Sequence, residues 1–196
     1  MDETDIHAMT ATPGAGFKIR AIARGVDVLY AWVLQFVAVI IGGTVLEVMT
    51  LSGKIPPGWQ QRSTGPSVTG VVLVLAGSLL YHTLCEWTSG ATLGKQICGL
   101  RVIAQDGGSC SIRGATIRNL SWYIDSLFFG MVGYDAMGKS PQKQRYGDKW
   151  GRTMVARCGD LSPQSKKSAG RFVLGLLVCS FVWCWALAWG VILKGQ

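Results

Sequence analysis

The sequence predicts an all-α membrane protein with three transmembrane helices, a fourth helical segment and a small cytoplasmic β-hairpin. Only 15% of the 196 residues are charged and 49% are hydrophobic, whereas a soluble domain carries roughly 25% charged residues. Three long segments contain no formal charge: residues 28–46, 68–85 and 172–193. Each is close to or above the ~20 residues that a helix needs to cross a bilayer. We therefore expect the lipid bilayer to surround much of the chain.

The chain starts with a polar tail, residues 1–16, whose composition predicts disorder. It lacks the apolar core of a cleaved secretory signal, so the first span, expected at 21–49, is predicted to act as its own insertion signal. Arg20 and Asp27 lie two helical turns apart and share one face of this helix. Two interpretations of Asp27 stay open: a local ion pair with Arg24, three residues away, and a wider functional pairing.

The second span is expected at 68–87, after a connector rich in Gly and Pro at 51–67. His82 and Glu86 stand four residues apart near its end and therefore share one face. Such a pair at a membrane boundary is typical either of a proton relay or of an interfacial structural contact. The sequence leaves both interpretations open.

A β-hairpin is predicted after the second span. Apolar and polar residues alternate over 100–105, a Asp-Gly-Gly turn follows at 106–108, and a second strand is expected at 109–112. Lys95 precedes the first strand and Arg101 lies within it, and we expect both to contact the phosphates of lipid headgroups. The GATLGK segment before it fails the P-loop pattern, because only three residues separate its glycines and Gln96 follows Lys95.

Residues 119–138 form the fourth helical segment, which Asp125 and Asp135 interrupt. Its longest uncharged run is nine residues, about 13.5 Å as a helix, against a hydrocarbon core of about 30 Å. We predict a re-entrant or interfacial helical hairpin that turns near Gly130 and Gly133, with a true fourth span as the alternative. A hairpin places 16 of the 19 Lys and Arg residues on one side, which predicts a cytoplasmic N-terminus and an external C-terminus.

A basic linker at 158–171 leads to an additional C-terminal span at 172–196, whose tryptophans are typical of interfacial anchors. The net charge of +8 is attributed to membrane topology and anionic headgroups, since no nucleic-acid-binding motif accompanies it. The six cysteines show no spacing for a disulfide framework or a zinc site. We expect no metal, no cofactor and no catalytic site, because His82 has no evident nucleophile partner.

Several short motifs occur in a fixed order along residues 17–157. They are R-x-x-A-x-x-x-D at 20–27, TLGK at 92–95, GLRV at 99–102, DG at 106–107, RNL at 118–120, QRxGD at 144–148 and TxV at 153–155. Taken together, this stretch resembles the RDD family of membrane proteins, named for one Arg and two Asp. The resemblance places these three at Arg20, Asp27 and Asp148. At 150–152 the chain has Trp-Gly-Arg where family members often show a small apolar turn.

The resemblance implies two functions from different classes. One is a transporter or cation/proton exchange component that acts through membrane-embedded Asp and Arg residues. The other is a non-transporting scaffold or assembly module that docks a partner, in which Arg20 pairs with Asp148 or Asp27 to lock the helices. The residues available to either function are Arg20, Asp27, His82, Glu86, Arg118, Asp125, Arg145 and Asp148. We expect a multi-pass protein of the bacterial inner membrane, with a homo-oligomer or a membrane protein as partner.

Overall fold

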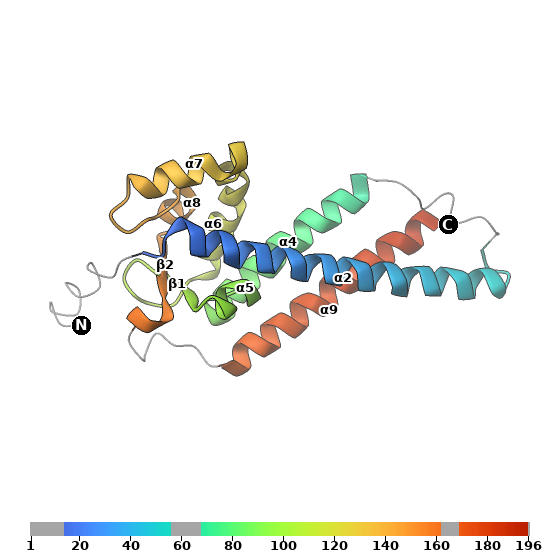
Figure 1. Cartoon of the computed structure of the whole chain (residues 1–196). Coiled ribbons are helices and arrows are strands. Elements are labelled where there is room, and N and C mark those ends of the chain that lie inside the picture. The colour runs from blue at the N-terminus through green and yellow to red at the C-terminus, as the bar shows by residue number, and fades with distance from the viewer. Residues whose placement is uncertain (1–13, 56–67, 162–168, 196) are drawn as a thin grey trace.

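The computed structural model describes residues 14–55, 68–161 and 169–195 (Figure 1). Most of the predicted tail, part of the connector and part of the basic linker lie outside these residues. The elements are α2 (Phe17–Leu51), α4 (Val68–Ser89), α5 (Leu93–Ile97), β1 (Leu100–Ala104), α6 (Ile112–Asp125), α7 (Leu127–Gly138), α8 (Tyr146–Trp150), β2 (Thr153–Arg157), a 3₁₀ turn (Cys158–Asp160) and α9 (Ala169–Gly195). In Figure 1, α2, α4 and α9 form a bundle, and residues 90–161, here called the head, gather at one end of it.

The three predicted spans are confirmed as long apolar helices. Residues 17–51, 70–89 and 170–190 are each long and apolar enough to cross a membrane. Their outward side chains, such as Leu29, Phe36 and Phe181, are 66–72% exposed in the protein alone, which is the surface that a bilayer would cover.

The interior of the bundle lies where α9 packs against both α2 and α4. Tyr81, Cys85, Cys179 and Trp183 are buried there in one cluster. A Cβ at Gly77 of α4 would overlap the Trp183 indole, so only glycine allows this approach. Trp183 is therefore a core residue and not the interfacial anchor that the sequence suggested.

The fourth segment forms two short helices, α6 and α7, of 14 and 12 residues. At roughly 21 and 18 Å, neither reaches across a 30 Å hydrocarbon core. Midway, the Tyr123 hydroxyl donates to the Leu75 carbonyl of α4 at 3.4 Å. The chain then turns back, and the ring of Tyr134 meets that of Phe17 edge to face, 5.3 Å between centroids. The segment is thus a helical hairpin with both ends in the head, and its insertion into lipid stays a prediction.

The predicted β-hairpin is reduced to one antiparallel bridge, between Ile103 and Ser109, and residues 109–112 do not form a strand. β1 pairs with β2 in an antiparallel sheet, in register from Leu100↔Arg157 to Ala104↔Thr153. The turn after β1 does form, since the Ala104 amide donates to the Gly108 carbonyl at 3.0 Å. Pairing between β1 and the segment after this turn ends before residue 111, because Ser111 caps α6. The Ser111 Oγ accepts from the Gly114 amide at 3.1 Å.

Candidate functional site

The charged residues of the head and of the adjoining helix ends form one buried cluster, and Arg20 lies at one end of it. Its Nη1 donates to Asp148 Oδ2 at 2.6 Å. Its other two donors reach the carbonyls of Ala15 and Lys143, both at 2.9 Å. Arg20 and Asp148 are 5% and 2% exposed. The start of α2 is thereby fixed to α8, to the segment before α2 and to the loop between α7 and α8. The pairing of Arg20 with Asp148 is one of the two that the sequence left open.

From Asp148 the charges alternate in sign across the head. Arg118 of α6 pairs with Asp148 Oδ1 at 3.2 Å and with Glu86 Oε2 at 3.3 Å. Glu86, at the end of α4, also accepts from Lys95 Nζ at 2.7 Å and from Asn119 Nδ2 at 2.9 Å. The chain of contacts therefore runs through α2, α8, α6, α4 and α5. It holds elements that are far apart in the sequence.

The pKa values outside the spans agree with this arrangement. Burial alone would raise the pKa of Asp148, but the guanidinium groups of Arg118, Arg20 and Arg145 lower it to about 2. Burial alone would lower the pKa of Arg118, but the carboxylates of Glu86 and Asp148 raise it above its ordinary value. Both groups are therefore charged at neutral pH.

Asp27 binds neither Arg20 nor Arg24 within the described residues. Its carboxylate instead accepts from Thr92 Oγ1 at 2.7 Å, from the Gly94 amide at 2.8 Å and from the Tyr81 hydroxyl at 3.0 Å. Gly94 lies so close to α2 that a Cβ there would overlap the Ala23 carbonyl oxygen. Asp27 thus fixes the first turn of α5 against α2, and of the alternatives left open for it the structure forms neither the ion pair with Arg24 nor one with Arg20.

His82 and Glu86 share a helix face but do not bind one another. His82 Nε2 contacts Arg24 Nη1, and the Arg24 guanidinium lies 4.1 Å over the Trp122 ring. His82 Nδ1 is buried without a hydrogen-bond partner among the described residues. The partners of Glu86 are Lys95, Arg118 and Asn119. No proton relay between the two side chains is formed in this arrangement.

Asp125 and Arg145 complete the cluster without full pairing. Asp125 Oδ2 accepts from the Gly147 amide at 3.3 Å, and its Oδ1 is buried without a partner in the described part of the chain. Burial raises the pKa of Asp125 above its ordinary value and lowers that of Arg145. A cavity of about 40 Å³ lies among the cluster side chains. It is lined by Arg20, Arg24, Glu86, Lys95, Arg118, Asn119, Trp122, Asp125, Arg145, Asp148 and Val155.

The expected headgroup contacts of Lys95 and Arg101 differ from what the structure shows. The Lys95 side chain is 13% exposed and is paired with Glu86. Arg101 is 7% exposed, and its aliphatic part lies against Gly90. Because neighbouring elements cover both side chains, neither is displayed toward a headgroup layer. The sequence could not show this, since the covering elements come from distant parts of the chain.

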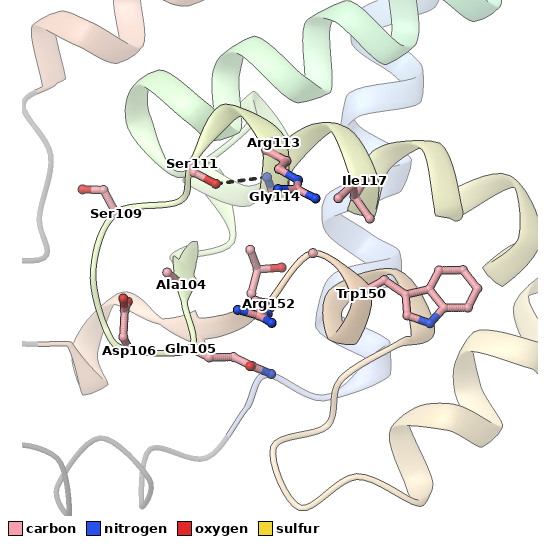
Figure 2. A pocket seen from close by; sticks show the side chains of 12 residues that line it. Ala104, Gln105, Asp106, Ser109, Ser111, Arg113, Gly114, Ile117, Trp150 and Arg152 are labelled. Atoms are coloured by element: carbon pink, nitrogen blue, oxygen red, sulfur yellow. Dashed lines mark hydrogen bonds between the residues drawn. The ribbon is translucent and has the colours of Figure 1, made fainter.

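A second, larger pocket of about 650 Å³ opens on the surface of the head (Figure 2). Three of its lining residues are Arg113 on α6, Trp150 at the end of α8 and Arg152 in the turn before β2. All three are exposed. Arg152 has φ +49°, an uncommon conformation for a residue other than glycine. At 150–152 the sequence departs from the family pattern that it resembles, and no role was predicted for this segment.

These features define a class: a membrane-type helical protein with three helices long and apolar enough to span a bilayer, joined to a head by a buried chain of alternating charges. The comparison with protein families gives the particular assignment. Residues 15–152 match the RDD family, and the chain belongs to that family. The match ends before β2 and α9. Neither the curated proteins nor the solved structures include a significant match to the chain.

Proposed function

We propose that this protein is a non-transporting membrane module that docks a partner protein, and that its Arg and two Asp serve as a structural clamp. The observation that carries the proposal is where the carboxylates bind. Asp27, Glu86 and Asp148 each bind two or more groups from other elements of the fold. To bind a transported ion, such a carboxylate would have to release its partners. Those partners are buried, and leaving them without a counter-charge destabilises the fold.

Cation/proton exchange is the second candidate, and the buried acids at the membrane boundary are what favour it. Two features count against it. Cationic side chains outnumber the carboxylates around the small cavity, so a further cation is repelled there. Beyond the cluster, Tyr81, Cys85, Cys179 and Trp183 pack together in the described interior of the bundle. A path through it would need several copies of the chain.

The surface pocket of Figure 2 is the docking site that we assign to this module. Tryptophan and arginine are the residues most enriched at the energetic centres of protein interfaces. Here Trp150, Arg113 and Arg152 line one pocket, with Asp106 as its acidic residue. The excess of positive charge fits an acidic segment of a partner protein.

We further propose that the head faces the cytoplasm of a bacterial cell and the C-terminus lies outside. The hairpin of α6 and α7 supports this orientation, since it leaves the basic residues of the head on one side of the membrane.

Flux in proteoliposomes separates the two candidates. Purified protein is reconstituted, and cation-driven proton movement is followed with an entrapped pH dye. We expect none above that of empty vesicles. Flux that is lost in Asp27→Asn would establish exchange and refute the clamp as the main role of these residues.

The docking proposal has its own experiment. Cross-linking in native membranes should capture a partner through the head of the wild type. The double variant Arg113→Glu/Arg152→Glu should lose that cross-link, while Lys18→Glu, an exposed charge on α2, should keep it. A cross-link unaffected by the double variant would move the docking site away from this pocket.

A further inference from the structure

We infer that the small cavity of the buried cluster binds a monovalent anion about the size of chloride. The first observation is a count of charge. Five cationic side chains line the cavity: Arg20, Arg24, Lys95, Arg118 and Arg145. Three carboxylates line it: Glu86, Asp125 and Asp148. Counting Asp27 nearby still leaves an excess of one positive charge. A buried charge without a counter-charge costs several kcal/mol, and the described residues do not supply the missing one.

The second observation is that hydrogen-bond donors are left over around this cavity. Arg24 Nε, Arg118 Nη1 and Arg145 Nε are buried and have no hydrogen-bond partner within the described residues. The three side chains come from α2, from α6 and from the residue before α8, and all line the cavity. Buried donors normally find an acceptor. One acceptor placed among three guanidinium groups would satisfy donors that the protein itself leaves unpaired.

The size of the cavity selects the kind of anion. Its volume of about 40 Å³ exceeds the roughly 10–15 Å³ that a single water requires by this measure. A halide is a single atom somewhat larger than water and fits. Phosphate and sulfate carry four oxygens around a central atom and need more room. A water fits too, but it brings no charge, so it leaves the excess positive charge in place.

Asp125 sets the strength of the site. Its Oδ1 is the one carboxylate oxygen of the cavity that is buried without a partner in the described chain. When ionised it repels a bound anion, and when neutral it can donate a hydrogen bond to one. Burial raises the pKa of Asp125 above its ordinary value, so the ionised form is the costly one. Removing the charge by Asp125→Asn should therefore tighten anion binding, whereas removing a donor by Arg145→Gln should weaken it.

The experiment uses the full chain in detergent and compares its Tm in sodium chloride, bromide, gluconate and sulfate at one ionic strength. We expect a saturable rise of Tm with chloride and bromide, about 5–10 °C at 100 times the apparent Kd. Gluconate and sulfate should give no such rise. Arg145→Gln should abolish the chloride response, and Asp125→Asn should lower the apparent Kd for chloride about 3–10-fold, as expected for the loss of one nearby like charge. Arg157→Gln, an exposed arginine at the end of β2, is the matched control and should keep the response.

Two results would overturn the inference. One is the same Tm in chloride and gluconate, which would mean that only water occupies the cavity. The other is a chloride response that Arg145→Gln retains, which would place the anion elsewhere. If Arg145→Gln does not fold, Arg145→Lys keeps the charge but not the planar donors and should raise the apparent Kd. The anion site goes beyond the docking function, and either can fail alone because one is measured in detergent and the other by flux and cross-linking.

Discussion

Loss of Arg20 tests the clamp most directly. Arg20→Ala removes the 2.6 Å ion pair with Asp148 and two hydrogen bonds to backbone carbonyls. Removing one partner of a buried pair typically costs about 3–5 kcal/mol. Asp148 keeps Arg118 at 3.2 Å, so we expect the lower end, about 3 kcal/mol. For a chain of this length that corresponds to a fall in Tm of about 6–12 °C.

The assay is thermal unfolding in detergent, read from the exposure of the buried Cys110 thiol. Asp148→Asn alone should give a similar loss, and the double variant should fall short of the sum by about 2 kcal/mol, because both single variants break the same contact. Lys18→Ala is the control, since Lys18 is an exposed cation on the first turn of α2, and it should change stability by less than about 0.5 kcal/mol. Additive losses, or a Lys18 effect as large as that of Arg20, would refute the clamp.

Four further predictions concern Asp148, Asp125, Gly77 and Cys158. The pKa of Asp148 is lowered to about 2, so its stabilising effect, about 2 kcal/mol, is present above pH 4 and is lost as the pH falls toward 2; acid titration of Asp148→Asn should lack that loss. The pKa of Asp125 is raised by burial, so its ionised form destabilises the fold at neutral pH, and Asp125→Asn should leave the Tm at pH 7 unchanged or higher. Gly77→Ala should lower the Tm by several degrees because its methyl group would overlap a tryptophan of α9, whereas Gly25→Ala, with open space around it, should not. A maleimide that cannot cross membranes should label Cys158 only after permeabilisation, and labelling in intact cells would reverse the proposed orientation.

The spans were predictable because hydropathy is a property of consecutive residues. The helix pairs inside the bundle were not, since the approach of Gly77 to Trp183 depends on two segments more than 100 residues apart. The same limit explains the β-sheet. The turn signal at 106–108 favoured pairing with the residues that follow it directly. In the structure β1 pairs with β2 over five residues, and no sequence pattern predicted this pairing.

The sequence predicted several residues of the buried charge cluster but not which of them bind one another. The ordered family motifs brought out Arg20, Asp27 and Asp148, and helix spacing brought out Glu86. Neither could show that Asp27 would bind Thr92 and the Gly94 amide, although the TLGK motif contains both groups. Lys95 was assigned to the membrane surface because a basic residue between apolar segments usually faces headgroups. The Lys95 side chain instead points into the head because it pairs with Glu86. The sequence had suggested His82 as the partner of Glu86.

The pairing of Arg20 with Asp148 determines how late in translation the head can form. The two residues are 128 positions apart, which a ribosome working at about 5–20 residues per second needs roughly 6–25 s to translate. Throughout that interval Arg20, at the start of α2, has no carboxylate of α8 to bind. The head can close only after the last of its parts emerges. A chain that stops before α8 therefore leaves the guanidinium of Arg20 without its carboxylate partner.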